Sequence, residues 1–183
     1  MNEMELRIIN IDVDKIRNQL ITLSAVLVKK ENQVNKIYDF PDNRLLSSKG
    51  YARIRLVEDL ITSNNYYYMT TKKIISQDKF KVMEENEVKI DNPSEGEKIF
   101  ISLGLVLLSS ISKYRESYKY KNSLIEIDIN DKTFCPFPYI EIETNFEEEL
   151  NEILDKLGFS INDTTSKTIF QLIEEYNSKE LGK

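Results

Sequence analysis

The amino-acid sequence predicts an α+β fold that is dominated by antiparallel β-sheet. Apolar and polar residues alternate at every second position along most of the chain, as they do in strands with one buried face. The pairs Asn64-Asn65 and Lys121-Asn122 lie between consecutive alternating segments and suit hairpin turns. The remaining segments carry apolar residues at the three- and four-residue spacing of amphipathic helices.

Period-two alternation marks eight strand segments. The predicted strands are Glu3–Ile9, Asn35–Phe40, Tyr51–Val57, Tyr66–Ile74, Phe80–Ile90, Ser112–Tyr120, Ser123–Ile129 and Tyr139–Thr144. One-sided alternation of this kind is typical of antiparallel sheets, whose two faces meet different surroundings. It therefore favours antiparallel over parallel pairing for most of the sheet.

The first helix is predicted between the first two strands. Asp12 is a suitable N-cap because its carboxylate can accept hydrogen bonds from the first turn. The apolar stripe that follows consists of Ile16, Leu20, Leu23 and Leu27, at spacings of four, three and four. We therefore expect one helix that contains all four apolar residues.

Three more helices are predicted later in the chain. The segment Ser94-Glu95-Gly96-Glu97 has a capping-box pattern and opens a helix that ends near Gly104. Apolar residues at helical spacing then predict helices over Glu147–Leu157 and Ser166–Tyr176. Helices at the edges of an antiparallel sheet complete the α+β assignment.

Composition and charge limit the possible functions. A chain of 183 residues suits a single domain over residues 1–183, and its net charge of −6 argues against binding along duplex nucleic acid. Cys135 is the only cysteine, the chain starts with acidic residues, and the apolar stretch Ile99–Ile111 is too short for a membrane span. These features predict a cytoplasmic protein. Histidine is absent, which excludes histidine-based catalytic sites and leaves oxygen atoms as the ligands of any metal.

Charged residues recur in pairs two positions apart within the predicted strands. The set consists of Glu3 and Glu5 with Arg7, Arg53 and Arg55, Glu85 and Glu87, Lys113 and Arg115, Glu126 and Asp128, Glu141 and Glu143, and Lys72 on a further strand. Because side chains alternate between the two faces of a strand, both members of each pair point to one side of the sheet. A solvated sheet face would show the same alternation. Such a face tends to mix signs, however, whereas most of these strands carry one sign.

If the sheet closes into a barrel, the charged face can line its lumen. Carboxylate oxygens are the ligands that Mg²⁺ or Mn²⁺ prefers. The planar guanidinium groups of Arg53, Arg55 and Arg115 suit bidentate binding of phosphate. Acids and bases together in one lumen therefore predict metal-assisted chemistry on a phosphate chain.

The ordered set of charged motifs resembles the CYTH domain, a family also called the triphosphate tunnel metalloenzymes. The N-terminal Glu3-x-Glu5-x-Arg7 resembles the Glu-x-Glu-x-Lys signature of that family. The similarity continues through Tyr38-Asp39-Phe40-Pro41-Asp42, Arg53-Ile54-Arg55, Thr70-Thr71-Lys72, Glu85-Asn86-Glu87, Lys113-Tyr114-Arg115, Asp128 and Ile140-Glu141-Ile142-Glu143. The resemblance extends over about the whole chain, and it implies an eight-stranded antiparallel β-barrel, or tunnel, with flanking helices.

The resemblance also implies roles for individual residues. The expected metal ligands are Glu3, Glu5, Asp128, Glu141 and Glu143, with Mg²⁺ or Mn²⁺ as the cofactor. The expected substrate-binding residues are Arg7, Arg53, Arg55, Lys72, Lys113 and Arg115, and the expected catalytic residues are Lys72 and Glu5. Glu85, Glu87 and Glu126 are expected to be additional inward acids.

The sequence departs from the family pattern at three positions. Arg7 replaces the signature lysine, Met83 stands where an arginine often precedes the Glu-x-Glu pair, and Ile37 replaces the first aromatic residue of the family's Tyr-Tyr-Asp stretch. The last departure argues against a thiamine triphosphatase. Tyr114 and Tyr139 are expected to point outward and pack against the helices.

Three functions are compatible with the resemblance. The favoured one is a divalent-metal-dependent phosphohydrolase that acts on inorganic tripolyphosphate, a nucleoside triphosphate or another organic triphosphate. A class IV adenylyl cyclase that converts ATP to cyclic AMP is the first alternative, and a non-catalytic binder of polyphosphate or nucleotide is the second. The expected partner is a small triphosphate compound, with no duplex nucleic acid or membrane, and the expected assembly is a monomer or homodimer.

Overall fold

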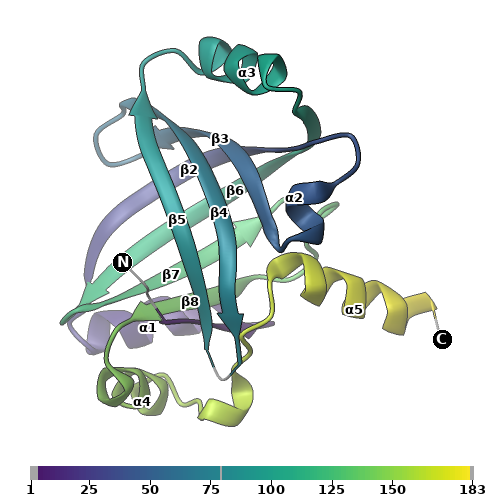
Figure 1. Cartoon of the computed structure of the whole chain (residues 1–183). Coiled ribbons are helices and arrows are strands. Elements are labelled where there is room, and N and C mark those ends of the chain that lie inside the picture. Colours follow the sequence, from purple (N-terminus) through teal and green to yellow (C-terminus); the bar gives the residue numbers. More distant parts are fainter. Residues whose placement is uncertain (1–3, 79, 182–183) are drawn as a thin grey trace.

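The computed structural model describes residues 4–78 and 80–181 and contains a closed β-barrel with helices around it (Figure 1). The strands in these residues are β1 (Met4–Ile9), β2 (Val26–Asp39), β3 (Gly50–Asp59), β4 (Asn65–Gln77), β5 (Lys81–Ile90), β6 (Val106–Tyr120), β7 (Ser123–Asn130) and β8 (Tyr139–Thr144). Their order around the barrel is β1-β5-β4-β3-β2-β6-β7-β8, and neighbouring strands pair antiparallel. The predicted eight-stranded antiparallel barrel is confirmed.

The helices pack around the outside of the barrel (Figure 1). They are α1 (Val13–Thr22), α2 (Arg44–Ser47), α3 (Pro93–Ser102), α4 (Glu147–Lys156) and α5 (Ile169–Leu181), with a short 3₁₀ helix, η1, at Ile161–Asp163. In the part of the chain that the structure describes, no helix is both long and apolar enough to cross a membrane.

The main hydrophobic core lies between the outer face of the barrel and the helices α1 and α4. The outward residues of β7 and β8, which alternate with the charged pairs, are almost fully buried; Ile125 and Ile140 are two of them. They pack against residues of α1 such as Leu20 and residues of α4 such as Ile153. The charged face of these strands must therefore point the other way, into the lumen.

A second, smaller core forms under α3. The ring of Phe100 on this helix lies 5.3 Å from the ring of Tyr38 on β2, measured between centroids. Gly96 allows the helix to approach the sheet closely, since a Cβ atom at this position would lie 2.7 Å from Cδ1 of Ile90 and 3.1 Å from Cδ1 of Ile54. The approach of α3 thus depends on a residue without a side chain.

The segment before α5 completes the wall of the barrel between β1 and β4. Among the described residues, strand β1 pairs with β5 at Met4 and Glu5. Beyond that point the backbone of Arg7 forms two hydrogen bonds with Thr165, both 2.9 Å long. Gln77 on β4 donates a hydrogen bond of 3.0 Å from Nε2 to the carbonyl of Ser166. The C-terminal part of the chain therefore covers the edge that β5 leaves open.

The first helix is shorter than the sequence predicts. It ends at Thr22, because Ser24 adopts a left-handed backbone conformation with φ of 60° that turns the chain into β2. Leu27, predicted to lie on this helix, is part of β2 instead. Strands β2 and β6 both begin before their predicted starts and pair with each other from Val26 and Lys119 to Asp39 and Val106.

Several other boundaries also differ from the prediction. Asn92, rather than Ser94, caps α3, and its side chain accepts hydrogen bonds from the backbone N–H of Ser94 and Glu95. The turn at Lys121-Asn122 is confirmed, whereas β3 and β4 are joined by the longer loop 60–64. Helix α5 begins at Ile169, three residues after its predicted start. The short helix α2 is absent from the sequence-based prediction.

Candidate active site in the barrel lumen

A cavity of about 540 Å³ lies within the barrel, and charged side chains from six strands line it. The charged residues of its wall on these strands are Glu5, Arg7, Arg53, Arg55, Lys72, Lys81, Lys113, Arg115, Glu141 and Glu143. Nine of these ten belong to the predicted site, and Lys81 is the addition. The alternation of the strands accounts for this grouping, because residues two apart on each strand share the inner face.

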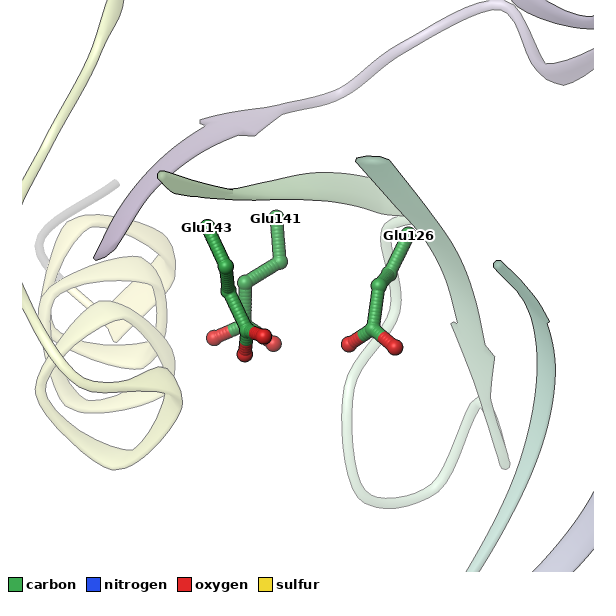
Figure 2. Close-up of side chains that lie close together, drawn as sticks. All are labelled: Glu126, Glu141 and Glu143. Atoms are coloured by element: carbon green, nitrogen blue, oxygen red, sulfur yellow. The ribbon is translucent and has the colours of Figure 1, made fainter. Parts of the chain in front are cut away.

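Three glutamates from β7 and β8 form an acidic cluster (Figure 2). Glu126 and Glu141 are register partners on the two strands, and Glu143 lies two residues further along β8. One carboxylate oxygen of each lies within 4.8 Å of the others. Figure 2 shows that the three carboxyl groups extend to the same side of the two strands. This arrangement can supply hard oxygen ligands to one cation.

Glu143 differs from the other two glutamates because no hydrogen bond or ion pair neutralises it within the described residues. Burial raises the pKa of Glu143 to about 8, and repulsion from Glu126 and Glu141 adds to the shift. A divalent cation would remove this repulsion and stabilise the ionised carboxylate. A metal ion bound to the cluster would thus allow Glu143 to carry a negative charge near neutral pH, as an ordinary carboxylate does.

Asp128, which the resemblance assigns to the metal, is held by two cations. Arg115 donates to its carboxylate from Nε at 2.7 Å and from Nη2 at 2.6 Å, and Lys113 donates from Nζ at 3.0 Å. Burial would raise the pKa of Asp128, but attraction to Arg115 and Lys113 lowers it below the ordinary value. Asp128 is not part of the three-glutamate cluster, whereas Glu126, expected only as an additional inward acid, is.

A second charged group surrounds Arg7 on β1. Its guanidinium forms ion pairs with Glu5 and with Glu141, its register partner on β8. Nη1 of Arg7 also donates a hydrogen bond of 2.8 Å to the carbonyl of Lys167, in the segment before α5. Burial raises the pKa of Glu5 to about 7, and the neighbouring Glu141 contributes to this shift.

Lys81 is a lumen residue that the sequence-based prediction did not include. Only 2% of its surface is exposed, and it forms an ion pair with Glu5, its register partner on β1. Its position was indicated by the sequence, because Lys81 lies four residues before Glu85 and is in phase with that strand's charged pair. It was missed because it is a single charge and not a member of a pair.

Arg53 belongs to a row of side chains that crosses β3, β4 and β5. Arg53, Thr70 and Glu87 are successive register partners. Nη2 of Arg53 donates to Glu87 and to Glu85, both at 3.2 Å, and Oγ1 of Thr70 donates to Glu87 at 2.8 Å. Lys72 pairs with Glu85 at 2.8 Å. Glu85 and Glu87 on β5 thus hold Arg53 of β3 and Lys72 of β4 in place.

Arg55 remains without a countercharge. Its Nε donates a hydrogen bond of 3.2 Å to Oδ1 of Asn35, and no ion pair involves this arginine in the described part of the chain. Burial lowers the pKa of Arg55 to about 10, and repulsion from Arg53 and Arg115 adds to the shift. Arg55 is therefore a cation with unused capacity to bind an anion.

The expectation that Tyr139 points outward is wrong. Tyr139 lies two residues before Glu141 and therefore shares the inner face of β8 with Glu141 and Glu143. Its ring lines the cavity, and the Cζ atom of Arg7 lies 5.9 Å from the ring centroid. Tyr114 does lie on the outer face, where its hydroxyl donates a hydrogen bond of 2.5 Å to Glu116.

Two uncharged positions named from the sequence also lie at the site. Ile37 and Met83, the two neutral departures from the family pattern, both line the cavity. Glu3 lies outside the described residues. The structure thus gathers the predicted residues that it describes in and around one lumen.

Comparisons with known proteins agree with this geometry. A model of the CYTH domain matches residues 1–169. A protein of Methanocaldococcus jannaschii that bears the provisional name adenylate cyclase MJ0240 is 27% identical over 181 residues, which cover 94% of this chain and 98% of that one.

Two solved structures illustrate the shared fold. PH1819 of Pyrococcus horikoshii has a TM-score of 0.78 and 23% identity, with 95% of this chain and 99% of that chain covered. HpAC1 of Hippeastrum, named provisionally as an adenylyl cyclase and described as having a dominant triphosphatase activity, has a TM-score of 0.71 and 20% identity, with 96% of each chain covered. With the family model matched over most of its length and a closed barrel of eight strands, the chain belongs to the CYTH domain family.

Proposed function

We propose that this chain is one catalytic domain over residues 1–183, a divalent-metal-dependent phosphohydrolase that releases the terminal phosphate of a triphosphate compound. The observation that carries the proposal is that the lumen contains both an acidic cluster and a cation without a countercharge. Glu143 and Arg55 both line the cavity, and neither forms an ion pair within the described residues. A metal–triphosphate complex carries the two charges that would complement them.

The donor set of the acidic cluster fits a Mg²⁺ or Mn²⁺ ion. Glu126, Glu141 and Glu143 would hold it through carboxylate oxygens, which are hard ligands. Such an ion supplies charge neutralisation to the phosphate oxygens when it is bound. Glu141 forms ion pairs with Arg7 and Arg115, so a cation held by this cluster would lie beside two arginines that would bind phosphate.

The basic residues would bind and orient the phosphate chain. Buried Nε atoms of Arg7 and Arg53 have no hydrogen-bond partner among the described residues, so each has a donor left for a phosphate oxygen. Arg55, Lys113 and Arg115, which also line the cavity, would complete this set. Multiple charge-assisted hydrogen bonds of this kind hold a phosphoryl group in line for attack.

Glu5 and Lys72 would serve the chemical step. The pKa of Glu5, raised to about 7 by burial, suits a general base that works near neutral pH. It would accept a proton from water as the water oxygen forms a bond to the terminal phosphorus and the bond to the bridging oxygen breaks. Lys72, which stays protonated beside Glu85, would stabilise negative charge on the leaving oxygen.

Adenylyl cyclase activity is the second candidate, because the relative from Methanocaldococcus jannaschii bears that provisional name. The same phosphate-binding residues would serve both reactions, but in the cyclase the ribose 3′-hydroxyl attacks the α-phosphorus and pyrophosphate leaves. Incubation with ATP and with tripolyphosphate, each with Mg²⁺ or Mn²⁺, tests the proposal through its products. Orthophosphate supports the phosphohydrolase, cyclic AMP supports the cyclase, and binding without product indicates a non-catalytic protein.

A further inference from the structure

Glu5 on β1 adds a fourth carboxylate to the acidic side of the lumen. Its register partner on β8 is Glu143, and the nearby Glu141 is the register partner of Glu126 on β7. The four glutamates therefore come from three neighbouring strands and share the inner face of the barrel. Carboxylates that meet in this way can hold two divalent cations about 3.5–4 Å apart. The number of cations that the lumen binds thus depends on whether Glu5 is available as a ligand.

Lys81 already occupies the position beside Glu5. It is the register partner of Glu5 on β5, and its Nζ atom forms an ion pair with Oε1 of Glu5. Arg7 forms an ion pair with the same oxygen atom, so Oε1 of Glu5 has two cationic partners. A divalent cation bound to this carboxylate would be repelled by both, and water and salt screen such repulsion little in a buried site.

Lys81 cannot leave this position without cost. Only 2% of its surface is exposed, so its ammonium group would lose its counterion without becoming hydrated. The ion pair also lies where β1 and β5 meet, since Glu5 with Lys81 and Met4 with Val82 are the register pairs that join these strands among the described residues. Displacement of Lys81 by a metal would therefore break a buried ion pair that links two strands of the barrel.

The fixed charges in this part of the lumen suit one divalent cation. Five carboxylates and four basic groups of the described residues meet there, namely Glu5, Glu126, Asp128, Glu141 and Glu143 with Arg7, Lys81, Lys113 and Arg115. When all nine are ionised they leave one negative charge. One divalent cation reverses the sign of this charge and makes the region attractive to a phosphate anion. A second would add repulsion, because Lys81 and Arg7 already neutralise Glu5.

Resting on the proposed function for the presence of a metal, we propose that the ammonium group of Lys81 takes the place of a second divalent cation. The lumen then binds one Mg²⁺ or Mn²⁺ ion, in the acidic cluster of β7 and β8. The family resemblance assigns Glu5 both to the metal and to the chemical step, and Lys81 leaves it only the second. Lys81 is thus a positioning residue that keeps the base apart from the carboxylates that bind the metal.

Titration of the metal-free protein with Mn²⁺, followed by electron paramagnetic resonance of the free ion, counts the sites. The wild-type protein and Lys81→Arg should each bind one Mn²⁺ per chain. Lys81→Met keeps an unbranched stem but removes the ammonium group, so it should bind two. Loss of a merely structural contact would not create a site. Two sites in the wild-type protein, or one site in folded Lys81→Met, would overturn the proposal.

Lys89→Met is the matched control for the loss of a lysine. Lys89 is an exposed lysine of the same strand, its Nζ atom lies 4.2 Å from the ring centroid of Tyr66, and it is not part of the cavity wall. This variant should bind one Mn²⁺ per chain. A second site in Lys89→Met as well as in Lys81→Met would assign the gain to the lower positive charge of the protein and would contradict the role of Lys81.

Substitution of Glu5 identifies the second site and does not depend on the folding of Lys81→Met. With Lys81 present, Glu5→Gln should lower the affinity for Mn²⁺ less than Glu143→Gln does, because Glu5 is not a ligand of the bound ion. In Lys81→Met, the additional change Glu5→Gln should return the number of sites to one. A loss of affinity in Glu5→Gln equal to or larger than that in Glu143→Gln would show that Glu5 binds the metal and would overturn the proposal.

Hydrolysis assays on the same proteins separate the role of Lys81 from the proposed function. A wild-type protein that binds one Mn²⁺ but hydrolyses no triphosphate disproves the proposed function, and the number of sites in Lys81→Met still decides the role of Lys81. Hydrolysis by a protein with two bound Mn²⁺ ions supports the proposed function and overturns the role of Lys81. A wild-type protein that binds no Mn²⁺ contradicts both.

Discussion

Arg115 and Asp128 are register partners on β6 and β7, and two nitrogen atoms of the guanidinium bind the carboxylate at 2.7 and 2.6 Å. This bidentate pair neutralises Asp128 within the protein itself. Glu143, in the same lumen, has no comparable partner within the described residues. Asp128 is therefore already neutralised by a side chain of the protein, whereas Glu143 can still be neutralised by a bound cation.

Glu143→Gln should raise the metal requirement. The substitution keeps the volume of the side chain but removes the anionic oxygen that a hard cation needs. We expect the Mg²⁺ concentration for half-maximal activity to rise by more than about tenfold, with partial recovery at high Mn²⁺. Glu148→Gln on the exposed face of α4 is the control. Full turnover of the wild-type protein in excess chelator would contradict the role of a metal.

Arg55→Ala should weaken the interaction with phosphate but not with metal. A charge-assisted contact is worth roughly 1.5–3 kcal/mol, so affinity or rate should fall about 10- to 150-fold. The metal requirement should remain as in the wild-type protein. Arg44→Ala, which removes an exposed arginine outside the cavity wall, should change neither quantity. Wild-type turnover by the Arg55 variant would show that this arginine does not bind substrate.

A second variant at this position, Arg55→Met, should not lose stability in the absence of substrate. Arg55 is repelled by Arg53 and Arg115, and these repulsions contribute to its lowered pKa of about 10. Replacement by Met, which keeps the apolar stem, relieves this repulsion. We therefore expect a free energy of unfolding equal to or above that of the wild-type protein, measured by urea denaturation without metal or phosphate. A clear loss would indicate a structural role for Arg55.

Metal-free protein should become less stable between about pH 4.5 and pH 8 because of Glu143. The pKa of this residue is raised to about 8 in the folded state. Below pH 4.5 the carboxyl is protonated in both the folded and the unfolded chain, so it does not lower the free energy of unfolding. As the pH rises, the unfolded chain releases the proton that the folded chain keeps, so stability falls and the penalty is complete above pH 8. Glu143→Gln should reduce this slope in urea titrations and leave the part that Glu5, with its pKa raised to about 7, contributes below pH 7; an equal slope in both proteins would assign all of it to other groups.

Asp39→Ala should destabilise the fold. Asp39 is fully buried, and its carboxylate accepts hydrogen bonds from the backbone N–H groups of Phe40, Leu45 and Leu46. Loss of these bonds at the start of α2 should cost about 1–3 kcal/mol in the free energy of unfolding. Asp42→Ala, at an exposed position of the same loop, should stay within about 0.5 kcal/mol. Equal effects of the two substitutions would contradict the capping role of Asp39.

Strand periodicity predicted which members of each charged pair share a face of the sheet, and the family resemblance predicted that this face lines a lumen. Arg53 and Arg55, or Glu141 and Glu143, face one way because the period of a strand is two, whatever the rest of the chain does. The partners of each residue could not be predicted in this way. They depend on cross-strand register, which places Glu126 opposite Glu141 and Asp128 opposite Arg115.

The helix boundary at Ser24 shows a second limit of sequence patterns. Leu27 continues the helical spacing of Ile16 and Leu20, but the chain has already reversed at Ser24. Pairing of β2 with β6 from Val26 onward requires an extended backbone, and these long-range hydrogen bonds outweigh the local preference. Patterns read from short segments carry no information on such distant partners.

The contact between Arg7 and Thr165 has a consequence for how the chain reaches its native state. Strand β1 is synthesised before the other strands of the barrel, yet it pairs with β8 and with a segment that follows α4. Ring closure must therefore wait until residues beyond 165 have emerged, and the entropy of bringing together segments so far apart is lost late. We expect slow folding, with the unpaired edge of β1 exposed in the nascent chain and open to association with other strands during synthesis.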